Sequence, residues 1–132
     1  MIRAIVENIV TSDDVSYYKF KIINCDVCLY MLSLSRILGV DESDSVWLNF
    51  KSSDVIIANE PLKNCSIKNE LKCEILGLVK GDILSIIHLK FNDYEFESII
   101  TTSSCEQLNL SMGDSIFAYI KSTSLYISCK DD

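Results

Sequence analysis

An internal repeat with an offset of 70 residues constrains this chain more than any other feature of its sequence. Such a repeat indicates two copies of one small module rather than a single large domain. Trp47 stands at the repeat position of Phe117, which favours a shared role for these rings in a core or an interface. Gly39 stands at the position of Asn109, and both residue types readily adopt a left-handed backbone. The identical pairs are Leu38 and Leu108, Asp44 and Asp114, Ser45 and Ser115, Lys51 and Lys121, Ser52 and Ser122, and Ile57 and Ile127.

Apolar and polar residues alternate with a period of two along most of the chain. Segments 82–91 and 115–121 show this alternation and are rich in β-branched and aromatic residues, which is typical of strands. Asn92 and Asp93 separate the first of these segments from residues 94–100, and this pattern predicts a hairpin. Long helical periodicity is missing, so the sequence indicates an all-β protein.

One short helix is expected in each half. Ser104 is followed three residues later by Gln107, which is the capping-box spacing. The second helix is therefore expected to begin at Ser103 or Ser104. Ser33 stands at the repeat position of Ser103 and marks the expected start of the first helix.

A single proline, Pro61, lies between the two copies of the repeat. Proline ends a strand and stiffens a connection, so we place the module boundary there, with modules at residues 1–62 and 63–132. Each module has room for about five strands, and a closed or partly open five-stranded barrel hides strand edges at that size. Because each module alone is too small to bury a large core, we expect the modules to pack on each other or on a second chain.

The formal net charge is −7, and this value excludes some classes of partner. A general nucleic-acid binder needs a basic face, and a protein that docks on anionic membranes needs basic residues. The first residues show no signal peptide, and no stretch approaches the roughly 20 apolar residues of a membrane-spanning helix. A cytoplasmic location is therefore expected.

The six cysteines do not indicate a clear site. Cys25 and Cys28 have CxxC spacing, which fits half a zinc site or a redox pair, and their function stays open. His88 is the only histidine and lies mid-strand, with no cysteine or carboxylate at ligand spacing. We therefore expect no metal site, and no nucleophile–base pair can be assembled, so catalysis is not expected.

Three polar clusters interrupt the apolar frame of the second half, at residues 66–69, 101–104 and 121–123. Each cluster has hydroxyl or amide donors, two have a lysine and none has a carboxylate, which suits an anion and not a hard cation such as calcium. Each hydrogen bond to a charged group contributes roughly 1.5–3 kcal/mol, so three or four could give roughly micromolar affinity. The same residues also fit helix caps and solvated lysines, so spacing alone leaves both interpretations open.

The clusters resemble the motifs of a known family. Residues 66–72, Ser-Ile-Lys-Asn-Glu-Leu-Lys, resemble the Ser-x-Arg-Asn-x-Leu opening of Mop domains, the molybdate-binding modules also called TOBE domains. Residues 113–123 resemble the family's ending, which runs from Gly-Asp to Ile-Lys-Ala/Ser-Thr. Thr101 and Ser104 fall where the family has Thr-x-x-Ser before its short helix. The resemblance covers residues 64–129.

The resemblance implies an OB-like β-barrel for each module, and thus two tandem OB-like five-stranded barrels. The paired di-Mop form occurs in storage proteins, in molybdate-responsive regulators and in molybdate-transporter ATPases. It also implies an oxyanion, molybdate or tungstate, bound at interfaces between modules or subunits. The residues carried over for oxyanion binding are Ser66, Lys68 and Asn69 from one edge, Lys121 and Ser122 from neighbouring strand ends, and Thr101 and Ser104 from a partner module.

The chain departs from the family pattern in both halves. Lys68 stands where arginine is usual, and lysine lacks the planar bidentate contact of arginine. The first module lacks the opening motif and keeps only Lys51 and Ser52, while Met31 and Leu34 replace the Thr and Ser. We therefore expect at most a weaker site in the first module.

Together these features predict an intracellular binding protein for molybdate or tungstate that serves storage, homeostasis or sensing, without an organic cofactor. A homo-oligomer, dimer or larger, is expected, and a transporter ATPase or a regulator is a candidate partner. A second hypothesis is a structural interaction module that has lost the anion. A third is single-stranded nucleic-acid binding, which OB barrels often perform, although the −7 charge counts against it.

Overall fold

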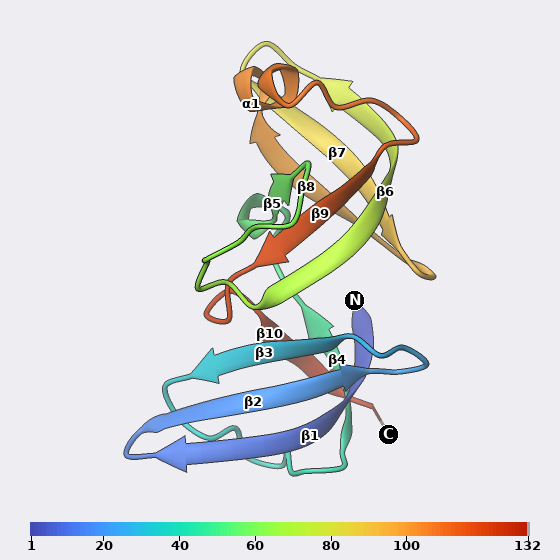
Figure 1. The fold of residues 1–132 in the computed structure, drawn as a ribbon. Coiled ribbons are helices and arrows are strands. Elements are labelled where there is room, and N and C mark those ends of the chain that lie inside the picture. Colours follow the sequence, from blue (N-terminus) through green and yellow to red (C-terminus); the bar gives the residue numbers. More distant parts are fainter. Residues whose placement is uncertain (132) are drawn as a thin grey trace. The chain divides into compact units, whose positions relative to one another are not determined.

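Two five-stranded sheets make up the fold, as the computed structural model of residues 1–131 shows (Figure 1). The chain divides into two compact units. The first comprises residues 1–50, 67–69 and 121 onward, and the second comprises residues 51–66 and 70–120. Strands dominate both units, so the predicted all-β class is confirmed. Within residues 1–131, neither of the two short helical segments is long and apolar enough to cross a lipid bilayer.

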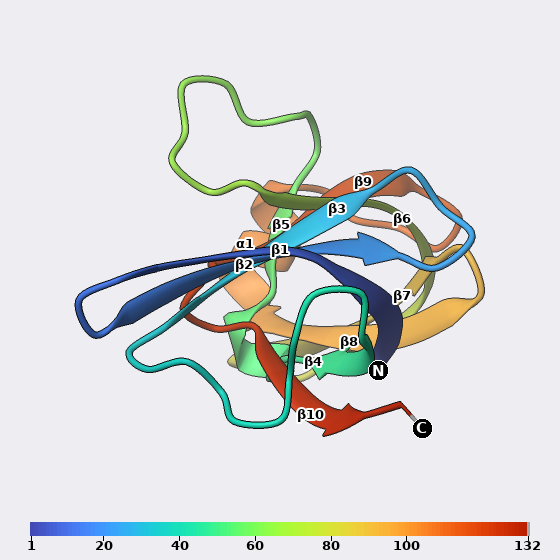
Figure 2. The ribbon, with the colours of Figure 1, turned by 90° about the horizontal axis from the view of Figure 1, so that it is seen from below.

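The first unit contains β1 (Ile2–Ser12), β2 (Val15–Ile22), β3 (Cys28–Ser33), β4 (Ser45–Asn49) and β10 (Tyr126–Lys130). Their order in the sheet is β10-β4-β1-β2-β3, and all neighbours pair antiparallel. A long hairpin joins β1 to β2, with Ser12 opposite Val15, and it is the blue ribbon of Figure 2. β3 therefore forms one edge of the sheet and β10 the other.

The second unit contains β5 (Ile56–Ala58), β6 (Asn69–Lys80), β7 (Leu84–Phe91), β8 (Tyr94–Thr101) and β9 (Ser115–Ile120), with the 3-10 helix η1 (Ser52–Asp54) and the helix α1 (Thr102–Gln107). Asn69, the first residue of β6, belongs to the first unit. Its sheet order is β5-β9-β6-β7-β8. The predicted hairpin at Asn92 is confirmed, because Phe91 lies opposite Tyr94. The Ser98 hydroxyl donates to the carbonyl of Val55 at 2.7 Å, which links β8 to the segment leading into β5. The two edges of this sheet are thereby joined, as in the expected OB-like barrel.

Each sheet takes one strand from the other copy of the sequence repeat. β5 belongs to the first copy and pairs with β9 of the second, with Ile57 opposite Ala118. β10 belongs to the second copy and pairs with β4 of the first, with Ile127 opposite Leu48. The compact units are therefore built from interleaved segments. The predicted modules, residues 1–62 and 63–132, describe the two copies of the sequence repeat and not these compact units, and their boundary stays a prediction.

The predicted alternation of apolar and polar residues places one face of each sheet in a core. In β1 the buried side chains are Ile2, Ala4 and Val6, and in β6 they are Leu71, Cys73 and Ile75, with exposed residues between them. Full burial of an aliphatic side chain contributes about 1.5–3 kcal/mol. A shift of register by one residue would expose every one of these side chains, so the alternation fixes the register of both strands.

Both long first strands carry a bulge at equivalent places, with an offset of 69 residues, one fewer than the offset of the sequence repeat. The pairing of β1 with β2 shifts between Val6 and Asn8, and the pairing of β6 with β7 shifts between Ile75 and Gly77. A bulge bends a strand and increases its twist. The duplicated bulge lets each long strand curve around its own core.

The helices differ from the sequence-based expectation. Helix α1 begins at Thr102 and not at Ser103 or Ser104, because Thr101 is its N-cap. The first-half helix expected from Ser33 does not form, and residues 34–39 are bends and a turn. Met31 and Leu34 stand at the repeat positions of Thr101 and Ser104, so the capping pair of α1 has no counterpart here, and the Ser33 hydroxyl donates to the carbonyl of Ser35 instead. Leu34 is 82% exposed, so burial does not stabilise a helix either.

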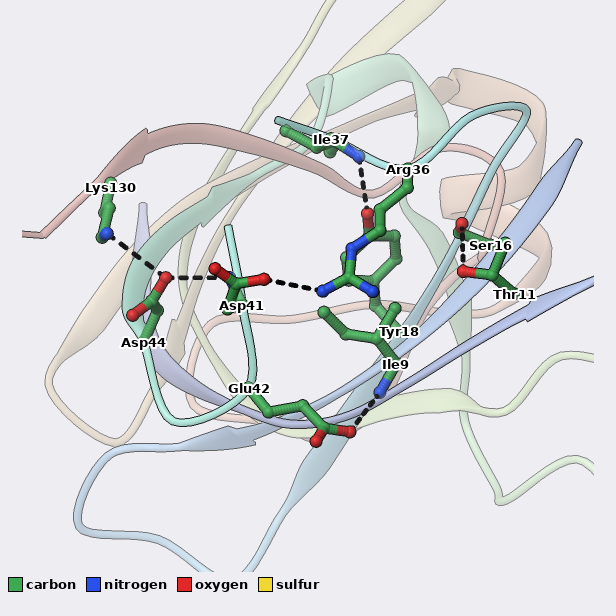
Figure 3. A network of polar contacts seen from close by, with 10 residues as sticks. All are labelled: Ile9, Thr11, Ser16, Tyr18, Arg36, Ile37, Asp41, Glu42, Asp44 and Lys130. Carbon is green, nitrogen blue, oxygen red and sulfur yellow. Dashed lines mark hydrogen bonds and ion pairs between the residues drawn. The ribbon is translucent and has the colours of Figure 1, made fainter. Parts of the chain in front are cut away.

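Polar contacts hold this loop of the first unit instead (Figure 3). The N–H of Ile37 donates to the Tyr18 hydroxyl at 2.8 Å, and the Arg36 guanidinium donates to the Asp41 carboxylate at 2.7 Å. The N–H of Asp41 donates to the Asp44 carboxylate at 2.8 Å. This backbone hydrogen bond holds the pKa of Asp44 below its usual value of 3.8.

The left-handed positions inferred from the repeat are confirmed. Gly39 has a φ of 80° and Asn109 a φ of 52°. The two residue types exchange at this position because both tolerate the conformation. The substitution preserves the backbone turn even though a helix precedes it in only one of the two copies.

Candidate functional site

The predicted site residues fall into two groups. Lys68, Asn69, Lys121 and Ser122 belong to the first compact unit, and Lys51, Ser52, Ser66, Thr101 and Ser104 belong to the second. The interleaving of the chain causes this division. Motif residues from the second half of the sequence lie in the unit that holds β1 to β4.

Asn69 is tied to the edge strand β3 of the first unit. Its side-chain Oδ1 accepts a hydrogen bond from the N–H of Tyr30 at 2.7 Å, and its Nδ2 donates to the carbonyl of Tyr30 at 2.8 Å. The Asn69 side chain is fully buried. It satisfies both backbone groups of one edge residue, so it stabilises the edge of β3 and fixes the start of the motif segment.

Lys68 lies beside the same tyrosine. Its Nζ is 5.0 Å from the centroid of the Tyr30 ring, which is within the range of a cation–π interaction. Tyr17 of β2 stacks on Tyr30, with 5.7 Å between ring centroids and an interplanar angle of 14°. The side chain of Lys68 is exposed, so its ammonium group is accessible to a ligand.

The second lysine motif approaches β3 two residues further along. The N–H of Leu32 donates to the carbonyl of Ser122 at 3.0 Å. The N–H of Ser124 donates to the carbonyl of Lys121 at 2.9 Å, which closes a turn at this motif. Two residues span about 6.6 Å along a strand. Segments 67–69 and 121–122 are therefore anchored side by side on β3, although more than 50 residues separate them in the sequence.

We call Lys68, Asn69, Lys121 and Ser122 the β3 cluster. It offers two ammonium groups and one hydroxyl, and the buried Asn69 holds the segment in place through its hydrogen bonds to Tyr30. Segments 67–69 and 121–123 contain no carboxylate. This set of donors is suited to an anion with several acceptor oxygens.

The second unit brings together a different set. The Thr101 hydroxyl accepts a hydrogen bond from the N–H of Ser104 at 3.1 Å and donates to the Ser104 hydroxyl at 2.8 Å. Both residues line a cavity of about 480 Å³. Ser53 also lines it, directly after Lys51 and Ser52 in the chain.

Aliphatic side chains form most of the wall of this cavity, and the lining contains no lysine or arginine among the residues that the structure describes. Lys51 is exposed and Ser52 half-buried at the start of η1. Ser66 is exposed and makes no hydrogen bond within residues 1–131. The aliphatic lining is Val55, Ile56, Ile57, Leu84, Ile99, Ile100 and Leu108, with Gln107 beside it.

The described part of the chain contains no group of three or more histidine, cysteine or acidic side chains that could hold a metal ion. The cysteines of residues 1–131 are free thiols. Cys25 accepts a hydrogen bond from the N–H of Val27 at 3.4 Å. His88 lies 3.1 Å from Glu97 on the neighbouring strand β8, so its partner is a cross-strand carboxylate.

Sequence reasoning did not identify Tyr30, Leu32 or Ser53 as parts of these sites. Tyr30 and Leu32 contribute backbone groups, and any residue except proline provides those. The alternation of β3 does place Tyr30 and Leu32 on the same face, which is the one available signal. Their partners in segments 67–69 and 121–122 follow only from the strand exchange.

Comparisons with known proteins find a matching family for the second half of the chain and a similar curated protein. The TOBE domain family matches residues 65–127. The molybdate/tungstate import ATP-binding protein WtpC of Pyrococcus abyssi (strain GE5 / Orsay) is 26% identical over 90 residues, or 68% of this chain. The present chain spans about a quarter of the length of that relative, since the match covers 26% of it.

Two solved structures are also similar. The cytoplasmic molybdate-binding protein ModG, crystallised with molybdate bound, superposes with a TM-score of 0.87 and 17% identity over 96% of this chain and 92% of that protein. A molybdate-binding protein from Sporomusa ovata is 28% identical over 46% of this chain and 90% of its own, with a TM-score of 0.44. The likeness to ModG extends over both sheets and establishes the two-module fold.

Proposed function

We propose that the protein binds a tetrahedral oxyanion, molybdate or tungstate, without converting it chemically. The match of residues 65–127 to the TOBE domain family supports this proposal. The observation that carries this proposal is the anchoring of two lysine motifs on one strand. Asn69 bonds to Tyr30 and Ser122 bonds to Leu32, so Lys68 and Lys121 extend from neighbouring segments. The β3 cluster is the ligand site of this proposal.

A doubly charged guest suits the donors of the β3 cluster. Each charge-assisted hydrogen bond contributes roughly 1.5–3 kcal/mol. Three of them together reach the binding free energy of a micromolar complex, roughly 8 kcal/mol, only when each lies near the upper end of this range. The net charge of −7 opposes the approach of a dianion, but screening limits this effect to charges within about 8–10 Å. The nearby lysines therefore dominate the local potential.

A second position for an oxyanion is proposed in the second unit. The Ser104 hydroxyl would donate a hydrogen bond there, and the Thr101 hydroxyl, which already donates to Ser104, would orient it. Lys51 and Ser52 stand close in sequence to Ser53 of the same cavity. Binding should be weaker than at the β3 cluster, because the cavity lining is mainly aliphatic. Ser66 also belongs to this unit, and its exposed hydroxyl is proposed as a further donor.

The proposed role is storage, homeostasis or sensing of the oxyanion in the cytoplasm. The chain is proposed to form a homo-oligomer, dimer or larger, and to act with a transporter ATPase or a regulator. The names of the relatives, an import ATP-binding protein and a cytoplasmic molybdate-binding protein, support this assignment. A structural module that has lost the anion is the less favoured alternative.

Isothermal titration calorimetry of the purified chain with molybdate, tungstate and sulfate tests the proposal. Micromolar or tighter binding of molybdate or tungstate is expected, and Lys121→Met should weaken it about tenfold or more. Lys90→Met is the matched control, because Lys90 is an exposed lysine of β7 outside both sites. Absence of heat with all three anions would establish the structural module instead. Light scattering with and without molybdate measures the oligomeric state.

A further inference from the structure

Tyr30 contacts both residues of the Lys68-Asn69 motif and is the point where three independent interactions meet. Its N–H and its carbonyl bond to the Asn69 amide at 2.7 and 2.8 Å. Its ring lies under the Lys68 ammonium, with 5.0 Å between Nζ and the ring centroid. The backbone of Tyr30 therefore fixes the motif segment, and its ring restricts the lysine side chain.

The ring itself is held in place from the neighbouring strand. Tyr17 of β2 stacks on Tyr30 at 5.7 Å, and Tyr17 lies opposite Leu32 in the register of β2 and β3. Stacked aromatic pairs at this separation are favourable. The ring of Tyr30 is therefore oriented by the sheet before any ligand arrives.

From this arrangement we propose that Tyr30 is a positioning residue of the oxyanion site and holds the Lys68 ammonium ready for the anion. This inference rests on the proposed function. Lysine is a flexible point charge that loses much side-chain freedom when it binds. A ring that already confines the ammonium removes part of that entropic cost from binding.

The geometry leaves donors free for the guest. An ammonium group has three N–H donors, and a ring on one side occupies only part of them. The ring thus orients the charge of Lys68. In an arginine side chain the rigid plane of the guanidinium group provides this orientation.

Affinity measurements on three variants test the proposal. Tyr30→Leu removes the ring and leaves the backbone bonds to Asn69 intact, so molybdate affinity should fall about two- to fivefold, the equivalent of an exposed cation–π contact. Tyr30→Phe keeps the ring and should bind molybdate with the affinity of the wild type. Tyr126→Leu is the control, because Tyr126 is an exposed tyrosine of the same unit with no lysine over its ring in the described structure.

A ligand-free measurement on the unmodified protein keeps the test independent of variant folding. The ε-methylene protons of Lys68 should show an upfield ring-current shift in NMR spectra, relative to those of Lys90. The shift should vanish in Tyr30→Leu and persist in Tyr30→Phe. An unshifted Lys68 in the wild-type protein would overturn the role of Tyr30.

The outcomes separate this inference from the proposed function. If Lys68→Met weakens molybdate binding while Tyr30→Leu binds like the wild type, only the role of Tyr30 is refuted. If the wild-type chain binds no oxyanion, the proposed function fails, and the positioning role fails with it. If Tyr30→Phe weakens molybdate binding as much as Tyr30→Leu does, the phenol hydroxyl, and not the ring, is the group that supports binding.

Discussion

Replacing Asn69 with alanine is expected to lower the free energy of unfolding by about 2–3 kcal/mol. The variant loses two hydrogen bonds to Tyr30, at 2.7 and 2.8 Å, each with a net contribution of about 1 kcal/mol. It also leaves the N–H and the carbonyl of Tyr30 unpaired on an edge strand. Water can reach this partly buried edge, so the additional desolvation cost stays near its lower limit of about 1 kcal/mol.

Thermal unfolding followed by circular dichroism measures this loss. For cooperative unfolding of the 132 residues, an unfolding entropy of about 2.1 cal/mol/K per residue sums to about 0.28 kcal/mol/K. A loss of about 2–3 kcal/mol then lowers the melting temperature by about 7–11 °C. Asn8→Ala is the matched control, because Asn8 is exposed in β1 and its side chain makes no hydrogen bond within residues 1–131. Its melting temperature should change by less than about 2 °C.

The variant Asn69→Asp separates the two hydrogen bonds. It retains an acceptor for the N–H of Tyr30 and loses the donor to the Tyr30 carbonyl, and it places a carboxylate in a fully buried position. Burial raises the pKa of such a carboxyl group, and its protonated form can donate to the carbonyl. Its destabilisation relative to wild type should therefore shrink as the pH falls. A melting temperature of Asn69→Ala within 2 °C of wild type would refute the role assigned to Asn69.

Three further measurements follow from the structure. The pKa of Asp44 is lowered by a backbone hydrogen bond, so its carboxylate stabilises the fold above about pH 4, and this contribution is lost as the pH falls through the lowered pKa. The stability difference between wild type and Asp44→Asn should therefore narrow between pH 5 and pH 2 in urea titrations, and a constant difference would contradict this assignment. Burial raises the pKa of Cys73 to about 12, so iodoacetamide at about pH 8 should modify exposed Cys65 and spare Cys73 in the native protein, as read by peptide mass spectrometry. Thr101→Val should cost about 0.5–2 kcal/mol of stability through loss of the N-cap, whereas Ser103→Ala should be nearly neutral, and equal effects would place the cap elsewhere.

Much of the fold can be predicted from local pattern. Alternation identifies the strands because burial of one sheet face requires a period of two. Residues 115–118 and the hairpin at Asn92 follow this rule, whereas Tyr119 and Ile120 at the end of β9 are both buried. The pairing of Gly39 with Asn109 predicts a left-handed turn in both copies because few residues tolerate a positive φ. These features depend only on neighbours along the chain.

Predictions that needed a longer context were less accurate. Ser33 and Ser103 looked like equivalent helix starts, yet only the second copy has a capping hydroxyl, that of Thr101, directly before the first residue of its helix, Thr102. A serine near the expected start is insufficient, because the cap must lie immediately before the first helical residue. The loop around Leu34 folds without a helix, since that side chain remains exposed.

The candidate site is divided in the same way. The sequence alone determines which donors exist, because Lys68, Lys121 and Ser122 are recognised by type and spacing. Which of them become neighbours depends on the exchange of β5 and β10 between the sheets and on the edge of β3, where Tyr30 and Leu32 receive the two motifs. Backbone groups of an edge strand look alike in every sequence, so only the tertiary pairing decides which residues they hold.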